Sequence, residues 1–158
     1  MIKEKNLPPG IMEKIPLLVE ALRRREDVIA LFFFGSLANH KLKPLSDLDM
    51  ALFLQEDMSK DRLFSRELDL MSLIAETLGT EEFDLIILNS APLRFAHQIL
   101  KSGKRIFVKD QKKLADFQEA VIKKYIDFKY YREQFDKEFL KGLKLHGRKD
   151  SGTLKAFE

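Results

Sequence analysis

The sequence predicts an α/β (α+β) domain, a small mixed β-sheet flanked by helices, followed by a long C-terminal helical segment. Two apolar runs of β type, residues 28–34 and, after its first two residues, 48–54, are typical of strands buried on both faces. Segments with helical periodicity alternate with strand-like runs, which favours a small mixed sheet covered by helices. In the stretch 111–145, apolar residues recur every three or four positions, as in an amphipathic helix.

The composition fits one globular domain and excludes several classes of protein. The 158 residues are 45% hydrophobic and 34% charged, and none is cysteine, which excludes a disulfide scaffold, a zinc–thiolate site and a cysteine nucleophile. No apolar run approaches the roughly 18 residues of a membrane-spanning helix, and no apolar signal segment follows the N-terminus. We therefore expect a cytoplasmic protein with no membrane contact. The net charge of +3 does not by itself indicate nucleic acid, and no direct binding to it is expected.

Start and stop signals predict two helices around the apolar runs. Pro16 suits a first helical turn, so a helix is expected from Pro16 to about Arg25. Ser59 is a favourable N-cap for a second helix ending near Leu78, where Gly79 occupies the position of a C-terminal glycine. The expected inner side of this second helix consists of Leu63, Leu68, Leu70, Met71, Leu73, Ile74 and Leu78.

Shorter elements are predicted in the middle of the chain. Residues 83–88 are typical of a third strand, residues 91–101 of a short helix, and residues 104–108 of a strand near an edge of the sheet. From 111 no proline occurs, and no glycine before Gly142, so one long helix or two with a short break is expected there.

The chain is expected to divide where this last segment begins. Residues 1–110 would form the core domain. Residues 111–158 would form a C-terminal helical extension that packs on the core, on a partner, or on both, because a sheet of three or four short strands cannot cover so long an apolar stripe.

The segment between the two apolar runs carries the chemistry. Gly35 ends the first run, Ser36 follows, and after ten further residues come Asp47 and Asp49, at the start of the second run. Aspartates two apart in a strand point to one face and repel each other unless a cation lies between them. Such oxygen ligands suit Mg²⁺ shared with phosphates. Gly35 lets a phosphate approach the backbone, and Ser36 adds a hydroxyl and an N–H.

Asp84, near the start of the third predicted strand, offers a third carboxylate. If the three predicted strands lie side by side, all three carboxylates converge next to Gly35. Three carboxylates, two metal ions and a phosphate cradle form the apparatus for in-line displacement at phosphorus. The alternative is a hairpin loop whose aspartates cap backbone N–H groups, with Asp84 merely solvated.

These residues resemble the signature of the minimal nucleotidyltransferases of the DNA polymerase β superfamily, in which Gly-Ser is followed after ten residues by Asp-x-Asp. Asn39 and His40 stand where the family form has Arg-Gly, and residues 83–89 are similar to the strand of its third aspartate. The resemblance covers most of residues 16–110 and implies the nucleotidyltransferase fold. Further matches to the family form are Ala38, Pro44 and Ser46.

The resemblance also implies roles for individual residues. Asp47, Asp49 and Asp84 would be the catalytic residues and the ligands of two Mg²⁺ ions, with Asp84 acting either as a ligand or as a base beside the incoming hydroxyl. The nucleotide, ATP, would be bound by Gly35, Ser36 and Ser46.

The C-terminal segment, with Tyr-Ile-Asp-Phe-Lys at residues 125–129, is similar to that of MntA-type antitoxins paired with HEPN ribonuclease toxins. This resemblance implies a protein adenylyltransferase that moves AMP from ATP to a tyrosine hydroxyl of a HEPN-type toxin encoded by a neighbouring gene. Two alternatives stay open, an antitoxin that neutralises its partner by contact alone and a nucleotidyltransferase that acts on a small molecule. A second copy of the chain, giving a homo-oligomer, is the alternative occupant of the C-terminal apolar face.

Overall fold

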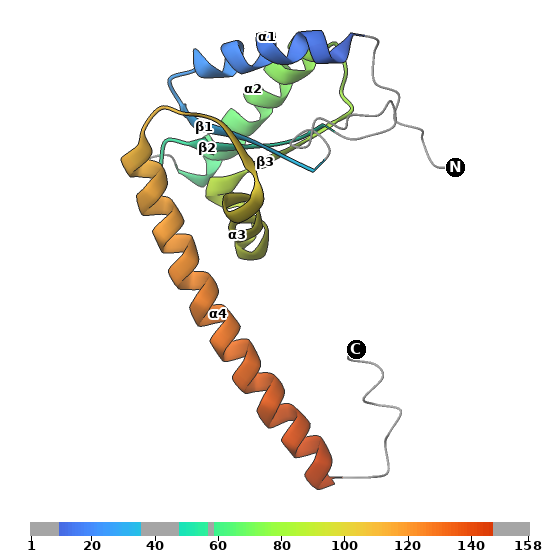
Figure 1. Ribbon diagram of the computed structural model, residues 1–158, viewed down its shortest axis with the longest axis vertical. Helices are drawn as coiled ribbons and strands as arrows, with labels where there is room; N and C mark the ends of the chain where they lie inside the picture. The colour runs from blue at the N-terminus through green and yellow to red at the C-terminus, as the bar shows by residue number, and fades with distance from the viewer. Residues whose placement is uncertain (1–9, 36–47, 57–58, 147–158) are drawn as a thin grey trace, which may run out of the picture. The chain divides into compact units, whose positions relative to one another are not determined.

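The computed structural model describes residues 10–35, 48–56 and 59–146, with side chains described as far as Leu143 (Figure 1). Its elements alternate along the chain between helices and strands. They are α1 Ile11–Arg23, β1 Val28–Phe34, β2 Leu48–Leu54, α2 Lys60–Leu78, β3 Phe83–Ile87, the 3₁₀ turn η1 Leu88–Ser90, α3 Leu93–Ser102, β4 Lys104–Val108 and α4 Gln111–His146.

The strands form one small mixed sheet, which confirms the predicted fold class. Their order is β3-β2-β1-β4; β1 is antiparallel to β2 and to β4, whereas β2 is parallel to β3. β1 and β2 occupy the centre and are mostly buried on both faces, which explains why their residues other than Asp49 are apolar. β4 is an edge strand, as its polar flanks predict.

Helices cover both faces of the sheet (Figure 1). α1 and α2 pack on the face to which Leu31 and Met50 point. α3 and the first turns of α4 pack on the other face, to which Phe32 and Ala51 point. In β2, and in β1 from Ala30 on, alternate residues therefore belong to different hydrophobic clusters. A register shift between Val28 and Ala30 interrupts the alternation at the start of β1.

The predicted start of the first helix at Pro16 is wrong. α1 begins at Ile11, so Pro16 lies inside it, where its ring removes the N–H that would bond to the carbonyl of Met12. Ile11 is only 7% exposed and belongs to the core, and Ile15 packs against the same cluster. Burial of these two side chains offsets the lost hydrogen bond, a tertiary effect that a proline-based boundary does not take into account.

The second helix has both predicted caps. The hydroxyl of Ser59 accepts a hydrogen bond from the backbone N–H of Arg62 at 3.3 Å, and Gly79 ends the helix with a φ of 69°. The expected inner side is wrong at two positions, since Leu68 is 50% and Met71 40% exposed. The prediction is confirmed at Leu70, Ile74 and Leu78, which are buried.

After α2, β4 has the expected bounds, whereas β3 and α3 differ from the expected ones by one or two residues. β3 ends at Ile87 because Leu88 already begins the 3₁₀ turn. Within that turn the Asn89 side chain accepts a hydrogen bond from the Leu54 N–H at 2.9 Å and donates one to its carbonyl at 2.8 Å. This amide replaces a further strand pair at the end of β2. Gly103 connects α3 directly to β4. A residue with a side chain would not fit there, because its Cβ would lie 2.5 Å from the Ile99 carbonyl oxygen.

The C-terminal segment is one helix of 36 residues. Contacts divide the chain into two units, residues 1–121 and 122–158. Within the first unit, Leu114 and Val121 are buried and Phe117 stacks on Phe53 with ring centroids 4.6 Å apart. The predicted division at residue 110 stays a prediction about domains.

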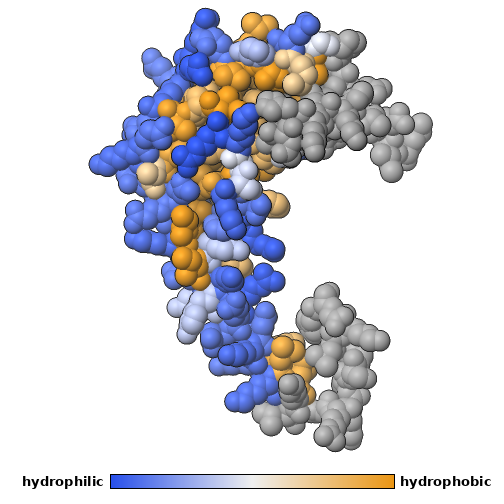
Figure 2. All heavy atoms as spheres, viewed as in Figure 1, coloured by the Kyte–Doolittle hydropathy of each residue, from blue (hydrophilic) through white to orange (hydrophobic). Residues whose placement is uncertain are grey.

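The second unit consists, in its described part, of the rest of α4. Apolar side chains interrupt its charged surface (Figure 2). Its large apolar side chains that are exposed are Ile122, Ile126, Phe128, Tyr130, Tyr131, Phe135, Phe139 and Leu140. None of the helices in the described ranges is both long enough and apolar enough to cross a membrane.

Candidate active site

Strand pairing brings together three of the predicted site residues at one end of the sheet. Phe34, the last residue of β1, pairs with Asp49 of β2, and Gly35 follows it. Asp49 in turn pairs with Asp84 of β3 in the parallel ladder. Paired residues of neighbouring strands lie about 4.8 Å apart with side chains on the same face. We call this place, with Gly35, Asp49 and Asp84, the carboxylate end of the sheet.

Both carboxylates lie on the face covered by α3 and the first turns of α4. Asp49 alternates with Ala51 and Phe53, which belong to the cluster on that face, and Asp84 alternates with Ile86, which packs against it. Asp49 is half-buried and Asp84 exposed. The strand pairing therefore fixes the backbone positions of Asp49 and Asp84 next to each other, without any contribution from loops.

Gly35 lies in contact with Asp49 and has a backbone conformation that favours glycine. Its φ is +65°, in the left-handed region that side chains other than glycine disfavour. A Cβ on Gly35 would collide with the Oδ2 atom of Asp49 and lie 3.4 Å from its Cγ. The missing side chain thus leaves room for the Asp49 carboxylate at the place where the sequence predicts a phosphate to approach.

Gly35→Ala is expected to cost about 1–2 kcal/mol of stability, the penalty of the left-handed conformation, and also to displace the Asp49 carboxylate. Gly79→Ala is the matched control. Gly79 has nearly the same φ, 69°, but its Cβ would meet only the end of the flexible Lys14 side chain, 3.1 Å away. Denaturant melts should show similar losses for the two variants. Calorimetry with Mg²⁺ and ATP should show weaker binding for Gly35→Ala alone, and equal binding by both would contradict the role of Gly35.

Ser36, Ser46 and Asp47, also predicted for this site, lie outside the described residues, as do Asn39 and His40. Within the ranges that the structure describes, no group of three or more acidic, histidine or cysteine side chains is arranged to hold a metal ion. Asp49 and Asp84 are two carboxylates of the predicted three. The roles of all the predicted site residues therefore stay predictions, and their geometry is known for Gly35, Asp49 and Asp84.

The residues that are described fit a magnesium–nucleotide complex. Two carboxylates on neighbouring strands offer the hard oxygen ligands that Mg²⁺ prefers, and Mg²⁺ usually binds through one or two carboxylates together with substrate phosphates. The absent side chain of Gly35 makes room for one of these carboxylates. The donor set is thus the one expected for a phosphate-bound cation.

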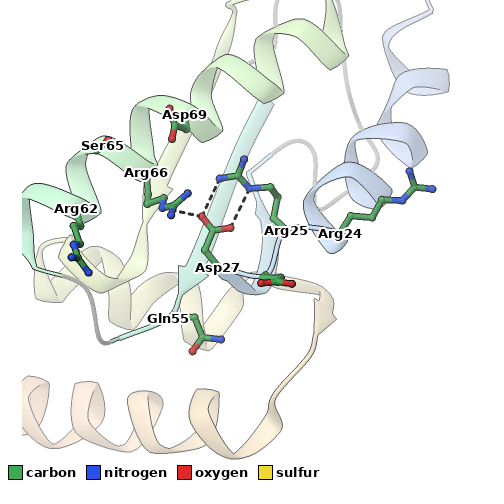
Figure 3. Close-up of a pocket in the computed structure, with 9 residues that line it drawn as sticks. Arg24, Arg25, Asp27, Gln55, Arg62, Ser65, Arg66 and Asp69 are labelled. Carbon is green, nitrogen blue, oxygen red and sulfur yellow. Dashed lines mark hydrogen bonds and ion pairs between the residues drawn. The ribbon is translucent and has the colours of Figure 1, made fainter.

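A polar hollow of about 970 Å³ lies at the opposite end of the sheet (Figure 3). Asp27 precedes β1 and Gln55 follows β2, so this hollow is separated from the carboxylate end by the length of a seven-residue strand, about 20 Å. Four arginines and three carboxylates line it. Because these charges nearly cancel, the hollow lacks the excess of one sign that attracts a charged substrate.

Asp27 is the centre of an ion-pair network at this end of the sheet. Its side chain is 12% exposed and accepts two hydrogen bonds of 3.1 Å from Arg25, while Arg66 of α2 lies 3.7 Å away (Figure 3). Burial alone would raise the pKa of Asp27, but the hydrogen bonds from Arg25 and the charges of Arg25 and Arg66 outweigh it, so the pKa is lowered. The sequence analysis missed this network, because Arg25-x-Asp27 has no pattern that distinguishes it from other surface charges.

Asp27→Asn is expected to destabilise the protein at pH 7 by about 1.5–3 kcal/mol, the worth of hydrogen bonds to charged groups. Since the folded-state pKa is below the unfolded one, this stability is fully present above about pH 4 and is lost as the pH falls through the folded value. Urea melts at pH 7 and pH 3 should therefore show a smaller difference between parent and variant at pH 3. An equal difference at both pH values would contradict the account of Asp27.

The chain matches one family model and several solved structures. The model described as polymerase beta, nucleotidyltransferase, matches residues 17–112. A chain of a toxin–antitoxin complex with AMP-PNP has a TM-score of 0.59 at 20% identity, over 81% of this chain and 97% of that one. A chain of the MntA–HepT toxin–antitoxin complex has a TM-score of 0.55 at 19% identity, over 84% and 99%.

A third structure is the complex of a tri-AMPylated Shewanella oneidensis HEPN toxin with an MNT antitoxin. One of its chains has a TM-score of 0.55 at 19% identity, over 82% of this chain and 96% of that one. At these identities the three structures show a shared fold. None of the curated proteins matches the sequence.

Proposed function

The chain belongs to the polymerase beta nucleotidyltransferase family, and from this premise we propose that it is a Mg²⁺-dependent protein adenylyltransferase. Its substrates would be ATP and a tyrosine hydroxyl of a HEPN-type toxin, and its role that of the antitoxin. The observation that carries the proposal is the pairing of Asp49 with Asp84 beside Gly35. Carboxylates on adjacent strands are suited to holding the metal ions that assist displacement at phosphorus.

The reaction follows from these positions. The tyrosine oxygen attacks the α-phosphorus of ATP, an O–P bond forms, and the bond from this phosphorus to the bridging oxygen of pyrophosphate breaks. Asp84, the more exposed of the two carboxylates, would act either as a further metal ligand or as the base that accepts the proton of the incoming hydroxyl. Asp49, with Asp47, would hold Mg²⁺, which supplies neutralisation of the phosphate charge. Gly35 and Ser36 bind phosphate oxygens through backbone N–H groups.

The acceptor is supported by the structural relatives. One of them is described with AMP-PNP and another contains a tri-AMPylated toxin, which agrees with AMP as the transferred group and with a protein as its acceptor. The exposed apolar side chains of α4 beyond Val121 agree with a protein partner, since contiguous apolar surface marks interaction sites. A small-molecule acceptor has no comparable support.

The test uses ATP labelled at either the α- or the γ-phosphate, mixed with Mg²⁺, this protein and the HEPN-type protein encoded beside it. We expect label on the second protein only from α-labelled ATP, on a tyrosine. Labelling from the γ-position would indicate a kinase. No labelling from either position, with stable complex formation, would favour the antitoxin that acts by contact alone.

A further inference from the structure

Arg105 lies on the same face of the sheet as Asp49 and Asp84. In the ladder of β1 and β4 it pairs with Phe32, two residues before Phe34, which pairs with Asp49. Residues two apart in a strand share a face, and so do paired residues of neighbouring strands. Arg105 is also the second residue of β4, whose start lies at the carboxylate end.

A contact outside the sheet agrees with this placement. The Arg105 guanidinium donates a hydrogen bond of 2.9 Å from Nη2 to the side-chain oxygen of Gln118. Gln118 belongs to the first turns of α4, which cover the face of Asp49 through Leu114 and Phe117. Register and hydrogen bond thus both place Arg105 on that face, and Gln118 limits the directions in which the guanidinium points.

Arg105 keeps most of its donors for another acceptor. A guanidinium has five N–H groups, and Gln118 accepts from one nitrogen. In the part of the chain that the structure describes, no carboxylate lies within ion-pair distance of Arg105, whereas Arg25 is paired with Asp27. An arginine held by a neutral amide, on a face that carries carboxylates, retains its full charge for an anion that reaches this face.

The distances suit a polyphosphate. Two strand spacings of about 4.8 Å separate β4 from β2, and two residues along the strand add about 7 Å. The backbones of Arg105 and Asp49 are therefore too far apart for a direct ion pair, and Phe32 and Phe34 of β1 lie between them on the same face. Only an extended anion would contact both side chains. Arginine recognises phosphate through paired hydrogen bonds that fit its planar fork.

We propose that Arg105 binds the β- and γ-phosphates of the nucleoside triphosphate while the α-phosphate lies at Asp49 and Asp84. This inference rests on the proposed function, because it takes a nucleotide as the occupant of the carboxylate end. Arg105 then stabilises the charge that develops on the pyrophosphate as it leaves. Gln118 is a positioning residue that orients the guanidinium.

The test compares the binding of AMP-PNP and of AMP, each with Mg²⁺, by calorimetry. Arg105→Met keeps the apolar stem but removes the charge, and is expected to weaken AMP-PNP about ten- to hundredfold, the range for hydrogen bonds to charged groups. AMP, which lacks the β- and γ-phosphates, should bind as to the parent. Arg105→Lys keeps the charge but lacks the planar fork of the guanidinium, so its affinity for AMP-PNP should lie between those of the parent and of Arg105→Met. Arg94→Met is the matched control. Arg94 is exposed in the first turn of α3, whereas Arg105 lies beyond the last turn of this helix, in β4.

The outcomes separate this inference from the proposed function. Unchanged AMP-PNP binding by Arg105→Met overturns the role of Arg105 and leaves the nucleotidyltransferase intact. An equal loss for AMP-PNP and AMP, or an equal loss for Arg94→Met, overturns it as well, because both would indicate a general effect on the fold. A parent protein that binds no AMP-PNP overturns both proposals.

Discussion

Asp49→Asn is expected to melt at the temperature of the parent or above it without ligand, and to gain almost nothing from Mg²⁺ with ATP. The substitution removes one of two carboxylates that the ladder holds side by side, so it relieves their repulsion. The parent should gain about 2.7 kcal/mol at a hundredfold excess of ligand over Kd, about 5–10 °C for a chain of this size. Thermal melts with Mg²⁺, with ATP, with both and with neither measure the difference.

The control for Asp49→Asn is Asp61→Asn, which removes a carboxylate from the first turn of α2. It is expected to respond to Mg²⁺ with ATP as the parent does. A full response by Asp49→Asn would mean that this carboxylate does not hold the metal–nucleotide complex. The same result would remove the physical basis of the proposed enzyme.

Truncation after Lys129 is expected to leave the core folded and to abolish co-purification with the HEPN-type protein. The buried part of α4 ends at Val121, and none of the removed residues whose side chains are described, 130–143, belongs to the two core clusters. They include Tyr131 and Phe135, which are 71% and 67% exposed and supply apolar surface for an interface. Co-expression followed by affinity capture, with a thermal melt of the truncated chain, measures both effects.

A matched pair of point variants tests the same helix without shortening it. Tyr131→Ser with Phe135→Ser should weaken the complex, whereas Lys137→Ser with Glu138→Ser should not. Size-exclusion chromatography of the chain alone shows whether the aromatic pair instead joins two copies. Capture of the partner at full strength by the truncated chain would show that this part of α4 is not its docking site.

The two central strands were predictable because they contain long apolar runs. β1 and β2 have the expected bounds, residues 28–34 and 48–54, and apart from Asp49 all their residues are apolar, as is typical of strands buried on both faces. The caps of α2 were predictable for a local reason as well. Ser59 and Gly79 act through the backbone of their own helix and need no tertiary partner.

Features that depend on distant packing were not predictable. Burial of Ile11 moves the start of α1 ahead of Pro16, and the way α2 lies on the sheet leaves Leu68 and Met71 exposed. The periodicity of apolar residues predicts that a helix forms, but it does not predict how the helix is rotated about its axis when it packs on the sheet.

The candidate site was predictable in part. The spacing of Gly35, Ser36, Asp47 and Asp49 indicates the chemistry, but the place of Asp84 beside Asp49 depends on strand order, which the sequence leaves conditional. No role was predicted for Arg105 from the sequence. Its relation to the carboxylates appears only when β4 pairs with β1.

The most direct test of the account is single-turnover transfer of α-labelled AMP to the HEPN-type protein by the parent, by Asp49→Asn and by Asp61→Asn. The account predicts that the parent and Asp61→Asn label a tyrosine at the same rate. It predicts that Asp49→Asn is slower by at least about a hundredfold, the cost of losing one group that stabilises transition-state charge. Transfer by Asp49→Asn at the parent's rate would contradict the claim that the paired carboxylates of β2 and β3 form the centre of a nucleotidyltransferase.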